Sequence, residues 1–186
     1  VPLASLDQVQ LDSLAHRPEQ ILPLSPLQAG LLFHSQLSDS NSTYVNQLVL
    51  PLTGVEPARM RQAWQALLAR HGVLRTSLLP ATLSDTRHQA VWSAQQVGLP
   101  WLEKDLRDVG ESALDDWCQH RLQTGFDLQA APLWRVDLLR TREPTWPCVL
   151  TPHHILMDGW STGVLLREFM APYHGQPPVP YTHPTP

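Results

Sequence analysis

The sequence predicts an α/β two-layer sandwich with a mixed, largely antiparallel sheet. Two observations predict this class. Helical and strand-like stretches follow one another in the order helix, strand, helix, strands, helix, strands, helix, a mixture that is typical of helices packed on a sheet. The chain has 186 residues, of which 42% are hydrophobic, which suffices for one substantial core in a globular protein.

In the first half of the chain, helices and a strand alternate. A helix is predicted to begin after Ser25, because serine is a good N-cap and Pro26 suits the first helical position. Residues 44–52 alternate in polarity as a strand does. The clearest helix covers residues 57–71, with apolar side chains at helical spacing, and ends at Gly72. The apolar face of the first helix is expected to carry Leu27, Leu31, His34 and Leu37.

The second half of the chain repeats this alternation between two weakly patterned ends. Residues 1–23 are expected to be an approach linker with one short helical turn, and the proline-rich residues 175–186 a second linker. Between these ends, strands are predicted at residues 87–92, 99–106, 133–140 and 148–151, and helices at residues 112–124 and 160–173.

Composition excludes several classes of function. The formal net charge of -4 and a pI near 6.1 provide no basic stripe for nucleic acid. No apolar run approaches the roughly 20 residues that span a bilayer, and the first residues lack a secretory pattern. We therefore expect a cytoplasmic protein without membrane contact. Cys118 and Cys148 fall within a predicted helix and a predicted strand, which favours buried free thiols over disulfides.

One short stretch concentrates the residues that could carry chemistry. Residues 151–161 join a short buried strand to a helical pattern and contain His153, His154, Asp158 and Gly159. Consecutive side chains on a strand point to opposite faces, so we expect one histidine to be chemical and the other structural. The acid can cap the amides at a helix start, and the glycine allows close approach of the backbone to a ligand.

Two simpler interpretations of these histidines compete with a catalytic one. A lone histidine beside an apolar strand is more often a core residue whose hydrogen bonds are satisfied. A metal site would need three or four ligands, whereas this stretch supplies at most two well-placed groups with no further Cys or His cluster nearby. Metal binding is therefore disfavoured.

Four passages, in order along the chain, resemble the condensation domains of nonribosomal peptide synthetases. Residues 153–159 match the signature His-His-x-x-x-Asp-Gly, and Trp160-Ser161 follow as they do in that family. More distant acyltransferases share only His-x-x-x-Asp. The other passages are residues 24–34, residues 125–135 with Gly-Phe-Asp-Leu-x-x-x-Pro-Leu-x-Arg, and residues 70–78, which depart from the family at Gly72 and Leu78, where Glu and Phe are usual.

The resemblance implies a chloramphenicol-acetyltransferase-like lobe. It identifies residues 24–174 as the N-terminal lobe of a two-lobed condensation domain, with residues 175–186 leading towards a C-terminal lobe. It implies an enzyme that joins a carrier-bound donor acyl or peptidyl thioester to the amine of a carrier-bound acceptor. The implied partners are upstream and downstream peptidyl carrier proteins that hold the substrates on phosphopantetheine. No covalently bound cofactor is implied, and the isolated lobe is expected to be inactive.

The resemblance also assigns roles to individual residues. It implies that His154 is catalytic and His153 structural, and the backbone amide of Gly159 becomes a candidate oxyanion donor. Whether His154 is a general base or a positioning group stays open, because an α-amino group with a pKa near ~8 is already roughly one-tenth neutral at pH 7. Arg75 is predicted to lie within an apolar strand, so it is either paired with an acid, for which we expect Asp158, or turned towards solvent.

Two other functions stay open from the residues alone. The lobe could be a non-catalytic docking module for carrier proteins, an interpretation that loss of either motif histidine would favour, and both are present. It could instead be an acyltransferase that uses soluble acyl-CoA. Trp160-Ser161 and the two N-terminal passages, which resemble synthetase domains, argue against that alternative.

Overall fold

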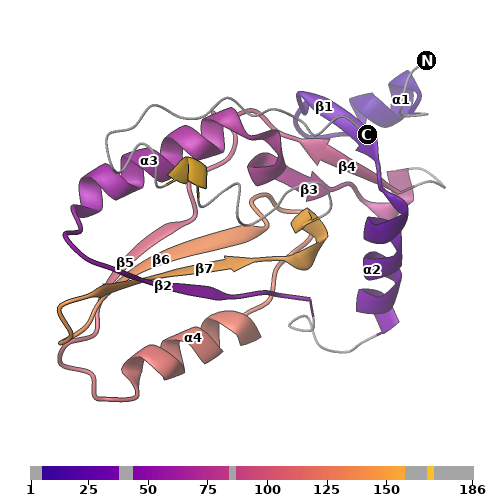
Figure 1. The fold of residues 1–186 in the computed structure, drawn as a ribbon. Coiled ribbons are helices and arrows are strands. Elements are labelled where there is room, and N and C mark those ends of the chain that lie inside the picture. Colours follow the sequence, from indigo (N-terminus) through magenta and orange to yellow (C-terminus); the bar gives the residue numbers. More distant parts are fainter. Residues whose placement is uncertain (1–5, 38–43, 84–86, 158–166, 170–186) are drawn as a thin grey trace.

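A computed structural model describes residues 6–37, 44–83, 87–157 and 167–169 of the chain (Figure 1). Its helices are α1 (Gln8–Asp12), α2 (Pro26–Leu37), α3 (Pro57–Arg70) and α4 (Ala113–Gln123). Its strands are β1 (Gln20–Pro23), β2 (Leu48–Leu52), β3 (Thr76–Leu78), β4 (His88–Val91), β5 (Trp101–Asp105), β6 (Trp134–Arg140) and β7 (Trp146–Pro152). Three short 3₁₀ turns are η1 (Gly72–Arg75), η2 (Ala81–Leu83) and η3 (His154–Met157).

The larger sheet has the strand order β2-β7-β6-β5. β2 pairs with β7 and β7 with β6 in antiparallel fashion, whereas β5 runs parallel to β6. The predicted α/β class with a mixed, largely antiparallel sheet is therefore confirmed. Figure 1 shows α3 and α4 on opposite faces of this sheet.

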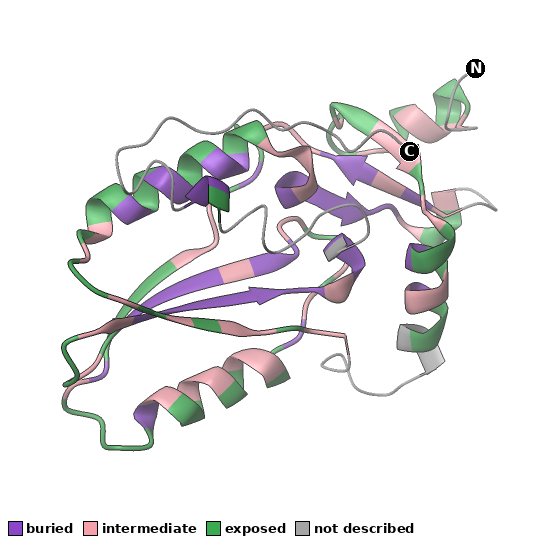
Figure 2. Cartoon of the chain, viewed as in Figure 1, coloured by how far each residue is buried: buried purple, intermediate pink, exposed green. Residues whose placement is uncertain are grey.

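The two central strands are buried on both faces (Figure 2). Side chains of a strand alternate between faces, and the two hydrophobic clusters follow that alternation. Leu138 and Leu150 join the cluster that contains Trp64 of α3, while Leu139 and Val149 join the cluster beneath α4. Burial on both faces explains why β7 reads as a continuous apolar run in the sequence.

Helix α3 matches its prediction closely. Its apolar residues at helical spacing are all buried, namely Met60, Ala63, Trp64, Leu67 and Leu68. The ring of Trp64 lies 5.4 Å from that of Trp134 and stacks at 4.6 Å on Phe169. The core therefore joins α3 to the larger sheet and to residues 167–169, which follow the histidine stretch in the sequence.

A smaller antiparallel sheet, β1-β4-β3, begins within the segment that we expected to be a linker. Helix α1 supplies the predicted short helical turn, but Gln20–Pro23 pair with His88–Val91 as strand β1. This strand has only four residues, and buried and exposed positions do not alternate along it. The sequence therefore lacks the alternating pattern from which a strand is predicted. Residues 20–23 are therefore part of the smaller sheet and not of a linker.

The predicted apolar face of α2 is wrong. Leu27 is 58% exposed and His34 is exposed, whereas Gln28 and Leu32 are buried. The N-cap prediction is confirmed, because Ser25 Oγ accepts a hydrogen bond from Gln28 N at 3.1 Å. The buried face is thus shifted by about one residue relative to the predicted one. The shift was not predicted because the buried face includes Gln28, a polar residue that a search for apolar residues passes over.

Arg75 ends the turn η1 and lies just before β3, so the prediction that it lies within a strand is corrected. Both cysteines are free thiols, as predicted, but only Cys148 is buried and Cys118 is half-buried. Burial raises the pKa of the Cys148 thiol to about 12. The predicted helix over residues 160–173 and linker over residues 175–186 fall outside the described residues, apart from three helical residues at 167–169. In the described part of the chain, no helix is long and apolar enough to cross a membrane.

Candidate active site at the histidine turn

The two histidines lie where β7 ends and the turn η3 begins. His153 forms an isolated antiparallel bridge with Val45. The amide of His153 donates to Leu133 O at 2.9 Å, and the amide of His154 donates to Tyr44 O at 2.6 Å. The backbone is thus bonded first to the segment that precedes β6 and then to the segment that precedes β2. These bonds extend the pairing of the larger sheet by two residues and deliver His154 at its end.

His153 is a buried, neutral side chain. It is 5% exposed, and its ring meets that of Phe126 edge-on with centroids 6.1 Å apart. Its Nδ1 accepts a hydrogen bond from Ile155 N at 3.0 Å. Burial, and to a lesser extent the charge of His154, lowers the pKa of His153 to about 4. At neutral pH this ring is therefore an uncharged acceptor for the backbone, which fits the structural role that we expected.

His154 is in a different situation. It is half-buried, and its Nδ1 is enclosed without a hydrogen-bond partner among the described residues. A buried ring nitrogen without a partner is uncommon, because the tautomer of a histidine is usually set by what one nitrogen bonds. Nothing in the described residues therefore bonds this nitrogen. In this respect His154 differs from His153, whose Nδ1 is held by Ile155 N.

A side chain from α2 also reaches this turn. Gln28, 6% exposed, donates from Nε2 to the carbonyl oxygen of Ile155 at 3.1 Å. Gln28 belongs to the passage 24–34 that resembles condensation domains, but no role in the site was predicted for it. It lies three residues after the N-cap Ser25, where Gln commonly completes a capping box. That spacing was the available signal.

Arg75 is buried, so the alternative that it faces solvent is wrong. It is 7% exposed, and its Nη2 lies 3.2 Å from Glu19 Oε2. Its Nε is enclosed without a partner among the described residues. Asp158, the partner that we expected, and Gly159 both lie outside the described residues. Glu19 is the observed partner, and it was missed because it lies in the segment interpreted as a linker.

A second buried polar group lies beneath α4. Asp137 of β6 is fully buried, and its two carboxylate oxygens each accept a hydrogen bond of 2.6 Å from Arg121. Trp117 Nε1 donates to the same carboxylate at 3.1 Å. These three residues lie on the face of the sheet opposite α3, so they anchor α4 and do not line the histidine turn.

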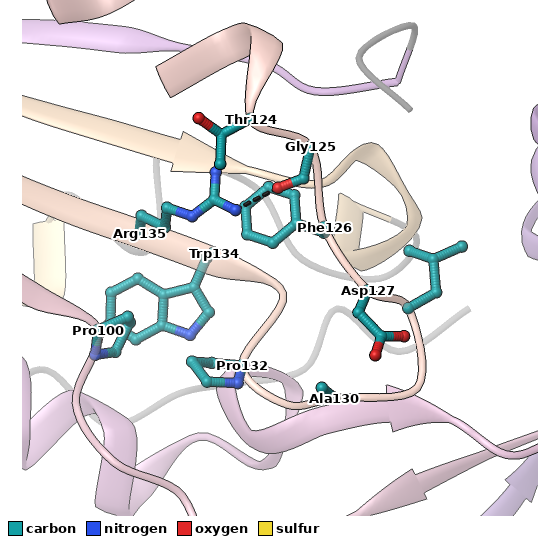
Figure 3. A pocket seen from close by; sticks show the side chains of 10 residues that line it. Pro100, Thr124, Gly125, Phe126, Asp127, Ala130, Pro132, Trp134 and Arg135 are labelled. Carbon is teal, nitrogen blue, oxygen red and sulfur yellow. Dashed lines mark hydrogen bonds between the residues drawn. The ribbon is translucent and has the colours of Figure 1, made fainter. Parts of the chain in front are cut away.

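A pocket of about 700 Å³ is lined in part by Phe126, whose ring meets that of His153 edge-on. Figure 3 shows the side chains that line it. The guanidinium of Arg135 lies 3.9 Å from the ring centre of Phe126 and donates to Gly125 O. Asp127 accepts from the amide of Gln129, and Thr124 donates to His120 O. The polar side chains at the rim are therefore bonded to the protein itself. The lining residues are Pro100, Thr124, Gly125, Phe126, Asp127, Leu128, Ala130, Pro132, Trp134 and Arg135.

This pocket is formed almost entirely by the passage 125–135 of the sequence analysis. Its main contribution to the turn is Phe126, which brings the pocket wall into contact with His153. Within the described residues, no three His, Cys, Asp or Glu side chains gather as a metal site would require. The candidate chemical group among the described residues is therefore the half-buried imidazole of His154, whose backbone is held by hydrogen bonds.

Comparison with known sequences provides a family model and several relatives. A model described as “Condensation domain” matches residues 18–184. A linear gramicidin synthase of Brevibacillus parabrevis is 35% identical over 179 residues, which cover 92% of this chain and 2% of that protein. A plipastatin synthase of Bacillus subtilis (strain 168) is 34% identical over 164 residues, which cover 86% of this chain and 4% of that protein. The chain thus spans only 2% to 4% of the length of these two relatives.

Solved structures of similar fold include two condensation domains. The starter condensation domain of rhizomide synthetase superposes with a TM-score of 0.72 at 21% identity, covering 87% of this chain and 41% of that chain. The condensation domain from the Monacolin K polyketide synthase superposes with a TM-score of 0.68 at 17% identity, covering 84% of this chain and 34% of that chain. At such low identity, these likenesses concern the fold.

Proposed function

The chain belongs to the condensation-domain family, and from this membership we propose that it forms the N-terminal lobe of a nonribosomal peptide synthetase condensation domain. The relatives in gramicidin and plipastatin synthases support the synthetase assignment. The lobe includes β1 and therefore begins by Gln20 instead of residue 24. It works together with a C-terminal lobe, towards which residues 175–186 lead.

The reaction is formation of an amide bond. The amine nitrogen of the acceptor aminoacyl group attacks the thioester carbonyl carbon of the donor. The tetrahedral intermediate then loses the thiolate of the donor carrier, which takes up the proton that the amine gives up. Both substrates are held on the phosphopantetheine of peptidyl carrier proteins, one upstream and one downstream. The lobe's own residues orient the amine, accept or relay its proton and stabilise the oxyanion.

The observation that carries this proposal is the contrast between the two neighbouring histidines. His153 is buried with its Nδ1 bonded to Ile155 N, whereas Nδ1 of His154 has no partner among the described residues. We assign His154 as the catalytic residue and His153 as its structural neighbour. His154 serves by orienting the amine or by taking a proton from the zwitterionic intermediate, and both tasks need the same position of the ring.

Gly159 and Asp158 complete the proposed site. The backbone amide of Gly159 donates to the oxyanion. Asp158 pairs with Arg75, whose buried guanidinium has an enclosed Nε left over after its contact with Glu19. A buried guanidinium with one unused donor is expected to seek a further acceptor. This pair would hold the residues after His154 in shape.

The test is product formation by a complete two-lobed domain supplied with loaded donor and acceptor carriers, followed by mass spectrometry. His154→Ala should lower the rate by about 100- to 10,000-fold, the usual effect of removing a positioned acid–base group. His153→Asn is the matched control, because its side-chain oxygen can still accept from Ile155 N. If His154→Ala forms product at the normal rate while it remains folded by circular dichroism, the assignment is wrong.

A further inference from the structure

The side-chain amide of Gln28 uses all of its hydrogen-bonding capacity. Its Nε2 donates to Ile155 O and to Gln89 Oε1, each at 3.1 Å. Its Oε1 accepts from Ser25 N and from Gln89 Nε2, each at 3.0 Å. A primary amide has two donor hydrogens and two acceptor lone pairs, so each is matched once in this buried position.

The orientation of this amide follows from its backbone partners. The peptide amide of Ser25 can only donate, and the carbonyl of Ile155 can only accept. Rotating the Gln28 amide by half a turn would place oxygen against Ile155 O and nitrogen against Ser25 N, and both bonds would be lost. The assignment of nitrogen and oxygen is therefore fixed by contacts whose roles are unambiguous.

The same amide connects distant parts of the fold. Ser25 is the N-cap of α2, Gln89 belongs to β4 of the smaller sheet, and Ile155 follows His154 in the turn η3. Gln89 also donates to Pro23 O at 3.3 Å, at the end of β1. Since β1 and β4 belong to the smaller sheet and η3 follows the larger sheet, Gln28 links the two sheets at the histidine turn.

The backbone around His154 is held on both sides. Its own amide donates to Tyr44 O, and the next amide, of Ile155, donates to the ring of His153. The carbonyl of Ile155 completes the set by accepting from Gln28. Of these three bonds, only the one from Gln28 comes from a side chain outside the turn.

We propose that Gln28 is a positioning residue for the reaction: by holding the carbonyl of Ile155 it sets the direction in which His154 presents its ring to the reacting amine. The inference deepens the proposed function and rests on it. In this role Gln28 acts through Ile155 and does not contact the substrates. Its effect is on the rate of the chemical step, because a misplacement of about 1 Å in a catalytic group can lower the rate about 100-fold.

The experiment uses the complete domain with loaded carriers and measures kcat and KM for both carriers between pH 6 and 9. Gln28→Met keeps the length of the side chain and removes its hydrogen bonds, and we expect kcat to fall by about 10- to 100-fold at every pH while KM stays within about 3-fold. Gln28→Glu is nearly isosteric, but its ionised form places oxygen against Ile155 O. Burial at this position should raise the pKa of the introduced carboxyl, so kcat should recover towards that of the wild type at the acid end of this range, where the protonated acid regains one donor.

Three controls separate positioning from a general loss of stability. Leu106→Ala lowers stability from the cluster on the other face of the sheet and should leave kcat per folded molecule unchanged. Gln89→Glu disturbs the amide pair while Gln28 can still reach Ile155, so its effect should be smaller than that of Gln28→Glu. If Gln28→Met fails to fold, Gln28→Asn keeps an amide that is one methylene too short to reach Ile155 O, and the same loss of kcat is expected.

The outcomes distinguish this inference from the proposed function. If His154→Ala is inactive while folded Gln28→Met and Gln28→Asn both have a wild-type kcat, the positioning role is wrong and the proposed function stands. The same holds if the Gln28 variants lose activity only in proportion to the folded fraction, as Leu106→Ala does. If His154→Ala itself is fully active, the proposed function fails first.

Discussion

Two buried polar networks link helices to the sheets of this lobe, and they differ in charge. Beneath α4, fully buried Asp137 takes two hydrogen bonds of 2.6 Å from Arg121 and one of 3.1 Å from Trp117. At the histidine turn, the neutral amide of Gln28 is bonded to Gln89 and to two backbone groups. The first network joins side chains to one another. The second ends on the backbone of the residue that follows His154.

This difference shows what each network contributes. An ionic pair removed from water costs much to break, because one charge is left without its partner. Such a pair anchors α4, but it has no contact with the turn. A neutral amide contributes less to stability, but a bond from its N–H to one carbonyl has a required direction. The charged network should therefore govern unfolding, and the neutral one the geometry of His154.

The largest expected effect on stability comes from breaking the charged network. Asp137→Ala leaves Arg121 unpaired, and because Arg121 is partly exposed we expect a loss near the lower end of the range for buried pairs, about 3 kcal/mol. Urea unfolding monitored by tryptophan fluorescence measures it. The paired replacement Asp137→Leu with Arg121→Met should recover most of the loss. If product formation per folded molecule also fell in Asp137→Ala, the separation between the two networks would be wrong.

An effect with a similar upper limit, reached only as the pH is lowered, is expected from His153. Its pKa is lowered from 6.5 to about 4, first by burial and then by His154, so the unfolded chain takes up a proton before the folded chain does. The free energy of unfolding should therefore decrease as pH falls from about 6.5 to about 4, by up to about 3 kcal/mol. Urea titrations at several pH values would measure this slope.

His153→Asn is the control for that slope. It cannot be protonated in this range, and its side-chain oxygen can still accept from Ile155 N. The variant should be less sensitive to pH than the wild type between pH 6.5 and 4, since the other titrating groups are common to both proteins. Equal slopes in the two proteins would mean that His153 is not the neutral, buried group described here.

The smallest effects are expected from Arg75, a buried cation that belongs to neither of the two networks. Its observed partner Glu19 is 47% exposed, so a double-mutant cycle of Arg75→Ala and Glu19→Ala should yield a coupling of at most about 1 kcal/mol. The proposed pair with Asp158 should couple more strongly, at about 1 to 3 kcal/mol. Both cycles can be measured by urea unfolding, and additive effects of Arg75→Ala and Asp158→Ala would remove that pair from the site.

The elements that sequence analysis predicted well are those whose packing is apolar. α3 buries every apolar residue that its periodicity selected. β6 lies where alternation over residues 133–140 predicted a strand, and β7 contains the predicted short buried strand at residues 148–151. The errors involve polar groups with tertiary partners. The face of α2 was predicted from its leucines, but Gln28 turns inward because Ile155 and Gln89 satisfy it.

The candidate site was predictable only where neighbouring residues in the sequence carried the signal. The motif selected His153 and His154, and their adjacency on a strand indicated two different environments. The apolar surroundings of Arg75 were compatible with a buried pair or with exposure to solvent, and the structure shows that Arg75 is buried. Its contact with Glu19 could not be foreseen, because Glu19 lies 56 residues away, beside a strand too short to be recognised. The pairing of β1 with β4 brings Glu19 close, and that pairing is a property of the folded chain.

The hydrogen bond between Gln28 and Ile155 joins residues that are 127 positions apart in the sequence. Closing a flexible loop of that length carries an entropic cost of about 4 kcal/mol or more, which local turn formation cannot offset. During synthesis, Gln28 emerges long before its partner exists, so the turn must wait for both sheets before it takes its final form. We therefore expect the orientation of His154 to be acquired late in folding, and a short peptide with the same motif to lack it.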